Sequence, residues 1–316
     1  MSTTRIYWLH CLSPTHVGTG RGVGYIDLPI HRDKVTRWPV IPASAFKGVW
    51  ADHYERLEDK HRAPTDDDRP RRERLSHELK MAFGFAPNDD TKASNAGALI
   101  PTDARIVCLP VRSFQGTFAW CTSALALKML RRDLELAGER NIPPAVVGPE
   151  SSEVLYDSEE TLLREGERTY LEDLDFDAEH NEIANSWAHW IAKQVFPNDS
   201  TWQTEFRRRF AILPDVVFNF LTETGTEVTA RVRIGDETKT VADGALWNEE
   251  SLPAETILAG LIACDRIYEK NSSGVTRDGL MAKFAHDPLT LQIGGKATVG
   301  RGRVRCVFTP VNGGAR

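Results

Sequence analysis

Apolar residues along the 316-residue chain follow strand-like spacing in some segments and helical spacing in others. Aromatic and branched side chains fill Arg5–Leu12, which predicts a strand. Apolar residues recur every three to four positions in Ala43–Leu57, which predicts a helix with Ser44 as its N-cap. The clearest amphipathic pattern is Thr122–Leu136, and Gly138 marks the end of that helix. The first half of the chain therefore combines strands and helices.

The second half shows the same mixture. Ile183–Gln194 predicts a helix. Thr226–Ile234 alternates like a strand, and Lys239–Leu246 is its expected partner across a turn at residues 235–238. Leu289–Thr309 predicts two strand segments separated by the glycine-rich stretch Gly294–Gly302.

Three further segments complete the expected elements. Ala98–Pro110 predicts a strand that bends at Pro101, and Asp215–Phe220 predicts a short helix or turn after a strand. Residues 140–200 are acidic and irregular apart from the one helix. Strand–helix units with long insertions predict an α+β fold, in which two helices cover one face of an antiparallel sheet. A doubly wound dinucleotide-binding sheet would require more regular βαβ units.

Composition narrows the class of protein. Hydrophobic residues make up 41% and charged residues 27%, as in ordinary globular proteins. The net charge of −6 is unusual for a nucleic-acid binder, unless its basic groups gather locally. The five scattered cysteines form no CxxC pair and suggest buried thiols in a reducing compartment. We find no signal-peptide core and no long apolar run, which predicts a cytoplasmic protein without a membrane partner.

The most charged segment is Glu58–Glu73, where both signs mix with two prolines. Within it, Asp66–Asp68 has the composition of a metal cluster. Three arginines follow directly at positions 69, 71 and 72, which favours a solvated loop that neutralises its own charge. We therefore do not expect a metal site there.

Two residues near the N-terminus are candidates for chemistry. Asp27 lies in a glycine-flanked loop before the restricted Leu28–Pro29 step, and such an aspartate is most often a turn former. His16 precedes a glycine-rich turn. It is either a loop histidine with structural hydrogen bonds or a donor and general acid–base group, since an ordinary histidine pKa is about 6.5. The residues alone leave both questions open.

Several cations accompany polar or glycine-rich segments. Ser44 and Lys47 lie where a helix begins, so free N–H groups, a hydroxyl and an ammonium favour a phosphate. Arg32 and Lys34 are close in sequence. In Gly294–Gly302 the glycines permit close approach of backbone to a polyanion. That stretch matches neither GxxxxGK[ST] nor GxGxxG, so a nucleotide site is disfavoured.

Four segments together resemble one known family. They are His16–Gly20 with Ile26–Arg32 (HVGTG and IDLPIHR), Pro39–Gly48 (PVIPASAFKG), Pro101–Phe118 (PTDARIVCLPVRSFQGTF) and Gly294–Gly302 (GGKATVGRG). With Thr226–Ile234 and Gly244–Pro253 they span nearly the whole chain in order. The sequence resembles the RAMP superfamily, and within it the repeated backbone subunit of type III-B CRISPR Cmr effector complexes.

The resemblance implies a fold and a set of partners. The palm would be a modified RRM- or ferredoxin-like domain formed by residues 1–140 and 255–316. An inserted region, 141–254, would include a β-hairpin thumb at about 222–250. Copies of the subunit would stack in a helical filament along a CRISPR guide RNA, together with other Cmr subunits. The guide would read a single-stranded target RNA by base pairing, and the paired target would be cut at intervals of about six nucleotides.

The resemblance also implies site residues. The catalytic aspartate of the family matches Asp27, which would hold a divalent metal ion, Mg²⁺ or Mn²⁺. Binding without RNA would be weak, since one carboxylate is a poor metal cage. His16 and Glu227 match positions that aid the cut, although Glu227 also fits a surface charge on a strand. The implied RNA-binding residues are Arg32, Ser44, Lys47, Arg112, Ser113, Gly294, Gly295, Lys296 and Arg301.

Some of these assignments have alternatives. Arg112 and Ser113 either line the guide groove or stabilise a turn. The protein is either a metal-dependent target endoribonuclease or a scaffold that binds RNA without cutting it. A third alternative is a metal-independent ribonuclease that processes guides with His16 as general base. The aromatic signatures of an ordinary RRM are missing, so bases are not expected to stack on the sheet.

Overall fold

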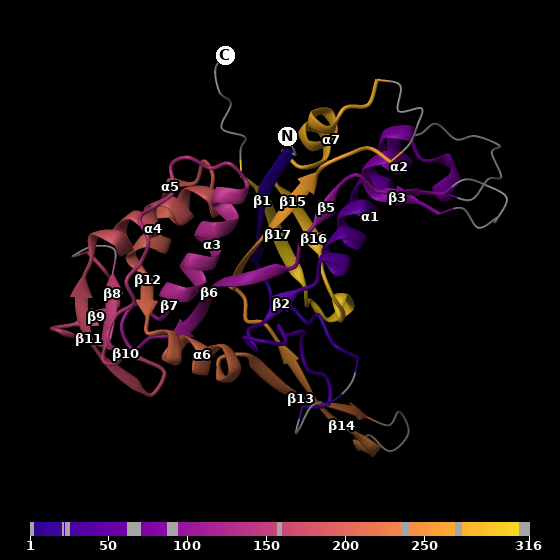
Figure 1. Ribbon diagram of the computed structural model, residues 1–316. Coiled ribbons are helices and arrows are strands. Elements are labelled where there is room, and N and C mark those ends of the chain that lie inside the picture. Colours follow the sequence, from indigo (N-terminus) through magenta and orange to yellow (C-terminus); the bar gives the residue numbers. More distant parts are fainter. Residues whose placement is uncertain are drawn as a thin grey trace.

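The computed structural model describes residues 3–20, 22, 26–61, 71–86, 94–156, 160–234, 241–268 and 274–309. In this part of the chain one large, mainly antiparallel sheet forms the centre of the molecule (Figure 1). Eleven of its strands follow the order β16-β17-β1-β15-β6-β7-β12-β8-β11-β10-β9, while β2 pairs with β6 and β5 with β15. The structure confirms the mixed α+β fold.

The elements have the following bounds. The large sheet contains β1 Thr3–Cys11, β2 Val40–Ile41, β5 Ile100–Pro101, β6 Ala104–Arg112, β7 Phe118–Ser123, β8 Glu153–Tyr156, β9 Arg164–Glu165, β10 Arg168–Leu171, β11 Leu174–His180, β12 Phe210–Leu213, β15 Ile257–Cys264, β16 Leu289–Gln292 and β17 Arg303–Phe308. Two separate pairs are β3 Gly84–Phe85 with β4 Asn95–Ala96, and β13 Glu227–Ile234 with β14 Val241–Ser251. The helices are α1 Ala43–His61, α2 His77–Phe83, α3 Ala124–Leu136, α4 Glu182–Val195, α5 Ser200–Arg208, α6 Asp215–Thr224 and α7 Arg277–Phe284, with 3₁₀ turns at Arg71–Arg74 and Ala297–Val299.

Strand β1 is buried on both of its faces. Successive side chains of a strand point to opposite sides, so Tyr7 packs on one side and Trp8 on the other. Tyr7 stacks on Phe46 of α1, with ring centroids 4.2 Å apart. Trp8 shares a buried cluster with Leu127 of α3 and Trp187 of α4. Helices therefore cover both faces of the sheet, whereas the sequence led us to expect them on one.

The predicted helices are present, but Ser44 is not an N-cap. Helix α1 already begins at Ala43, whose N–H donates to Asp103 Oδ1 at 2.7 Å. Asp103 lies in the bend between β5 and β6, so a residue distant in sequence performs the capping. In α3, by contrast, the local sequence is sufficient: Ser123 accepts from the N–H of Ala126.

The acidic stretch 140–200 is more regular than its sequence suggests. Strands β8, β10 and β11 extend the large sheet beyond β12. In β11 the side chain of Phe176 is buried, while the acidic Asp175 and Asp177 are exposed. Arg168 of β10 pairs with both carboxylates. Because charged residues occupy the solvent face, this alternating strand has too few apolar positions to be recognised from composition.

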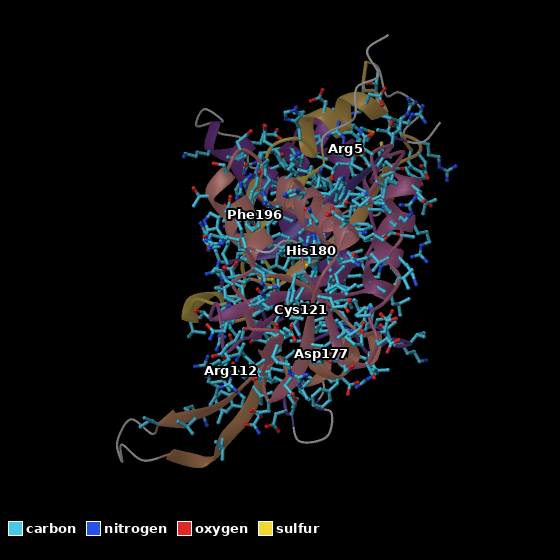
Figure 2. All side chains as sticks on the ribbon, turned by 90° about the vertical axis from the view of Figure 1, so that its left-hand side faces the viewer. Arg5, Arg112, Cys121, Asp177, His180 and Phe196 are labelled. Atoms are coloured by element: carbon cyan, nitrogen blue, oxygen red, sulfur yellow. The ribbon has the colours of Figure 1, made fainter. Side chains whose placement is uncertain are left out.

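The cysteines match their prediction. All five are free and buried, and burial raises the pKa of the Cys121 thiol well above its ordinary value. Figure 2 labels Cys121 within the packed body of the molecule. None of the helices described here is both long and apolar enough to cross a membrane.

The predicted thumb corresponds to a hairpin that projects from the body (Figure 1). Strand β13 pairs with β14 from Glu227 opposite Ser251 to Val232 opposite Leu246. The partner strand thus continues past the predicted end at Leu246. The predicted turn at 235–238 and the acidic run Asp66–Asp68 lie outside the described residues. The proposed division into palm and inserted region stays a prediction.

Candidate nucleic-acid interface and cleavage site

The Asp27 segment lies along the base of the hairpin. The N–H of Leu28 donates to the carbonyl of Asn248 at 3.0 Å, and the N–H of Glu250 donates to the carbonyl of Leu28 at 2.9 Å. Leu28 therefore forms a parallel bridge to β14. The segment is attached to the hairpin as a very short additional strand, which fixes the position of the residue before it.

Asp27 is exposed, and one of its two carboxylate oxygens accepts a hydrogen bond. Its Oδ2 accepts the backbone N–H of Asn248 at 2.8 Å. Oδ1 has no hydrogen-bond partner among the described residues. One oxygen thus holds the side chain against the hairpin, and the other has its lone pairs available for a ligand or a proton.

His16 lies beside this segment with a nearly buried ring. Its side-chain Nδ1–H donates to the carbonyl of Glu250 at 2.6 Å, and its own carbonyl accepts the N–H of Gly295 at 2.9 Å. A Cβ atom on Gly18 would lie 2.7 Å from Nε2 of the ring. In the neutral ring, donation from Nδ1 leaves Nε2 as the acceptor. The structural hydrogen bond is present, and a role of His16 in cleavage stays a prediction.

The glycine-rich loop between β16 and β17 crosses directly over His16. Gly294 has a φ of 81°, and a Cβ there would lie 2.1 Å from the His16 carbonyl oxygen. Only glycine accommodates both this backbone conformation and this contact. Gly295 follows and makes the hydrogen bond to His16. The sequence suggested that these glycines let the backbone approach a polyanion. In the structure, Gly294 and Gly295 let it approach the backbone of His16.

The two cations of that loop pair with carboxylates of the hairpin. Lys296 Nζ lies 2.7 Å from Glu249 Oε1, and Arg301 Nη1 donates to Glu227 Oε2 at 2.8 Å. Burial disfavours the charge on Glu249, but Lys296 and the Trp247 indole outweigh it, so the pKa of Glu249 falls below its ordinary value. Glu227 is consequently part of an ion pair at the hairpin base rather than an isolated surface charge.

The guanidinium of Arg32 is also bonded to other groups of the protein. Its Nη2 donates to Glu250 Oε1 at 2.6 Å, and its Nη1 donates to the carbonyls of Arg37 and Thr222, each at 2.9 Å. The side chains of Arg32 and Glu250 are only 11% and 2% exposed. We call the group formed by Glu227, Glu249 and Glu250 with their cationic partners the thumb base.

Ser44 and Lys47 occupy a different place, on the first turns of α1. With Gly48, Asp52 and Phe85 they line a groove of about 380 Å³ between α1 and the β3 segment. Burial lowers the pKa of Lys47, and the described residues provide no ion-pair partner for its ammonium. An anion placed here would contact a cation that is already partly desolvated.

Arg112 and Ser113 lie at the end of β6 and have contacts with the β10–β11 turn. Arg112 is 69% exposed and lies 3.2 Å from Glu172. Ser113 is buried, and its hydroxyl donates to the carbonyl of Tyr170 at 3.3 Å. Figure 2 labels Arg112 at the edge of the body. No described contact connects these two residues with Asp27, and their part in RNA binding stays a prediction.

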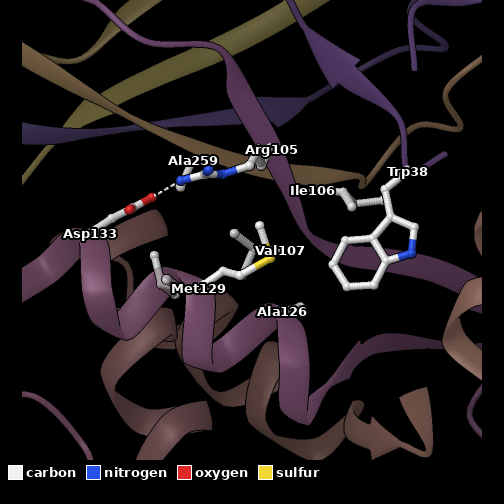
Figure 3. A pocket seen from close by; sticks show the side chains of 9 residues that line it. Trp38, Arg105, Ile106, Val107, Ala126, Met129, Asp133 and Ala259 are labelled. Carbon is white, nitrogen blue, oxygen red and sulfur yellow. Dashed lines mark hydrogen bonds and ion pairs between the residues drawn. The ribbon is translucent and has the colours of Figure 1, made fainter. Parts of the chain in front are cut away.

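The cavity between β6 and α3 is too small for a substrate (Figure 3). Its volume is about 20 Å³, and Trp38, Met129 and the Arg105–Asp133 ion pair line it. Such a space holds about one water molecule. The candidate site is therefore the open surface around the thumb base and the groove beside α1.

Three residues of the site, Asn248, Glu249 and Glu250, were absent from the sequence prediction. All three lie in the segment Gly244–Pro253, which carried the resemblance but had no assigned chemistry. Glu249 and Glu250 are adjacent, so they point to opposite faces of β14. That two neighbouring glutamates are both buried and paired depends on which loops cover each face, which no local pattern reveals.

Comparisons with known proteins identify the family of the chain. The family model of the RAMP superfamily matches residues 8–305. The chain is 34% identical over 310 residues to the CRISPR system Cmr endoribonuclease Cmr4 of Pyrococcus furiosus, covering 97% of this chain and 96% of that protein. These two matches span almost the whole chain.

Solved structures share the fold. A crystal structure of oligomeric Cmr4 from Pyrococcus furiosus aligns with a TM-score of 0.70 at 25% identity, over 99% of this chain and 100% of that one. A chain of the type III-B Cmr-beta complex bound to cognate target RNA aligns with a TM-score of 0.68 at 18% identity, over 96% of each chain, and supports the fold alone. The chain belongs to the RAMP superfamily and, within it, to the Cmr4 family.

Proposed function

We propose that this protein is a guide-RNA-binding backbone subunit of a type III-B CRISPR effector complex and a metal-dependent endoribonuclease that cuts the paired target RNA. The observation that carries the proposal is the exposed carboxylate of Asp27, which is fixed through one oxygen to the hairpin and whose other oxygen has no hydrogen-bond partner among the described residues. Membership of the Cmr4 family, whose Pyrococcus furiosus relative is named an endoribonuclease, supports it.

The residues around Asp27 fit a weakly held divalent metal ion. Among the described residues, no group of three or more histidine, cysteine or acidic side chains is arranged so that it could hold a metal ion by itself. A single free carboxylate oxygen suits Mg²⁺ or Mn²⁺, which commonly keep waters and bind substrate phosphate oxygens alongside one or two carboxylates. Asp27 is the residue that would hold the ion, which when bound supplies charge stabilisation at the scissile phosphate.

The chain's own groups account for the rest of the proposed chemistry. The carboxylate of Asp27 would also help to align the 2′-hydroxyl beside the scissile phosphate for in-line attack. Asp27 is bonded to the projecting hairpin, so a hairpin that displaced part of the duplex would bring this carboxylate next to the displaced strand. Lys47 and Ser44 bind guide phosphates in the groove beside α1. Sequence is read by base pairing, so the protein needs contacts to RNA backbone only.

The proposed partners are the guide RNA, the target RNA, other Cmr subunits and further copies of this chain in a helical filament. The oligomeric Cmr4 structure supports the assembly of several copies. Stacked copies would repeat the Asp27 site along the guide. Products spaced at regular intervals of about six nucleotides are the expected signature of such RNA-guided cleavage.

The decisive experiment replaces Asp27 in the reconstituted complex. With Mg²⁺ and a matched target, Asp27→Asn should lower the cleavage rate by about 10²–10⁴-fold while guide and target binding are retained. Asp287→Asn provides the matched control, because Asp287 is exposed and pairs with His286 near α7. Wild-type cleavage by Asp27→Asn would overturn the assignment.

The same assay separates the alternatives. A complex that binds target but yields no products with any divalent metal would be a scaffold. Cleavage of repeat RNA by the isolated chain in EDTA would instead indicate a guide-processing ribonuclease.

A further inference from the structure

Glu250 of β14 forms several hydrogen bonds with the segment that follows Asp27 and with its neighbours. Its side chain is 2% exposed. Through its carboxylate, its N–H and its carbonyl it bonds to Ile30, Arg32, Thr226, Leu28 and His16. One residue of the hairpin thus touches both candidate N-terminal segments.

The two carboxylate oxygens of Glu250 have separate tasks. Oε2 accepts the backbone N–H of Ile30 at 3.0 Å, three residues after Asp27. Oε1 accepts from Arg32 Nη2 at 2.6 Å and from the hydroxyl of Thr226 at 2.9 Å. Oε1 is therefore bound to Arg32 and to the residue just before β13, while Oε2 binds the backbone that follows Asp27.

The backbone of Glu250 holds the remaining side of the same segment. Its N–H donates to the carbonyl of Leu28 at 2.9 Å, and its carbonyl accepts from His16 Nδ1 at 2.6 Å. Together with the bond from Asn248 to the Asp27 carboxylate, the hairpin restrains positions 27, 28 and 30 directly. Each of these bonds involves at least one backbone group, which leaves little freedom to positions 27–30.

We infer that Glu250 is a positioning residue, which sets the place of the Asp27 carboxylate relative to the hairpin. The inference rests on the proposed function of Asp27. If Glu250 has this role, the Asp27 carboxylate keeps a fixed position relative to the hairpin. The carboxylate and the hairpin would then move as one unit when RNA binds. A loop attached only to the palm sheet would be free of the hairpin when the RNA bends.

The alternative is that Glu250 only stabilises the fold. A buried carboxylate requires several partners in any protein, and breaking its ion pair destabilises whether or not a site is nearby. The two roles differ in what they change: a positioning residue alters the rate of the bound complex, whereas a stabilising residue alters how much complex is folded and assembled.

Glu250→Gln in the reconstituted complex tests the inference. Glutamine has one acceptor oxygen and one amide donor, so it cannot accept from both Ile30 and the Arg32–Thr226 side. We expect the single-turnover cleavage rate at saturating target to fall about 10–100-fold, since small misplacements of reacting groups have effects of this size. The Kd for target should change much less, and cut positions should be kept.

Asp133→Asn is the matched control. Asp133 is also a buried carboxylate paired with an arginine, Arg105, but it lies on α3 and has no described contact with the thumb base. It should lose stability without losing the rate of the assembled complex. Thr226→Val, which removes one donor to Oε1, should lower the rate to a smaller extent and covers the case in which Glu250→Gln fails to assemble.

Two results would overturn the inference. One is a wild-type single-turnover rate for assembled Glu250→Gln, or for Thr226→Val if the former does not assemble. The other is a slower cleavage rate in Glu250→Gln that is equally slow in Asp133→Asn, or that returns to the wild-type rate when more target RNA is added. These results can be told apart from a failure of the proposed function. If Asp27→Asn loses cleavage while Glu250→Gln cleaves normally, only the positioning role of Glu250 is rejected.

Discussion

The cations at the thumb base and the cation at the start of α1 have the same chemistry and different surroundings. Arg32, Lys296 and Arg301 each face a carboxylate of the hairpin at 2.6–2.8 Å. Lys47 lines a groove and has no ion-pair partner among the described residues. The first three join segments of the protein to one another, whereas Lys47 retains its charge for a ligand.

The difference shows why basic residues in a motif are weak evidence of RNA contact. A guanidinium that is 11% exposed and bonded to three protein oxygens has little capacity left for phosphate. Lys296 is more accessible and has one carboxylate partner, so it stands between the two extremes. Three substitutions sharpen this comparison, from the largest expected effect to the smallest.

Arg32→Ala should have the largest effect on stability. Removing one partner of a buried ion pair leaves Glu250 uncompensated, and such changes typically cost about 3–5 kcal/mol of unfolding free energy. Chemical denaturation of the full chain measures this directly. Arg112→Ala, whose arginine is mostly exposed, should change it by about 1 kcal/mol or less. Arg32→Ala that folds like the wild type but loses RNA affinity would reverse the comparison.

Lys47→Ala should affect RNA and leave stability nearly unchanged. Loss of one charge-assisted phosphate contact should weaken guide binding about 10-fold. The slope of log affinity against log salt should fall by about 1. Lys283→Ala, in which the lysine is already paired with Glu78, is the control. Equal losses of affinity in the two variants would contradict a specific role for Lys47.

The smallest effect concerns pH. Because the pKa of Glu249 is below its ordinary value, the stability from its ionised form is present at neutral pH. It should be lost as the pH falls through the folded-state pKa. Melting curves from pH 7 down to about pH 3, below the ordinary glutamate pKa of 4.5, should therefore show the difference between wild type and Glu249→Gln narrowing on acidification. A constant difference would show that the charge of Glu249 contributes nothing.

The sequence was most informative where structure is local. The apolar run of β1, the amphipathic α3 with Gly138 after its end, and the glycine-interrupted final strands were all predicted from neighbouring residues. It was least informative in β8–β11, where exposed acidic residues hide the alternation, and at Ser44, where Asp103 supplies the bond to the first helical N–H. Those features depend on residues far away along the chain.

The resemblance placed Asp27, His16, Glu227 and the glycine-rich loop in one site, and the fold brings them to one hairpin. What the amino-acid sequence alone determined is the elements with a clear local pattern, such as β1 and α3, and the family, because both depend on local spacing and motifs. Only the tertiary structure decided which charges are paired, because Glu250 pairs with Arg32, 218 positions away, and Glu249 pairs with Lys296 of the loop between β16 and β17. That pairing separates the cations that build the thumb base from the lysine that remains available to RNA.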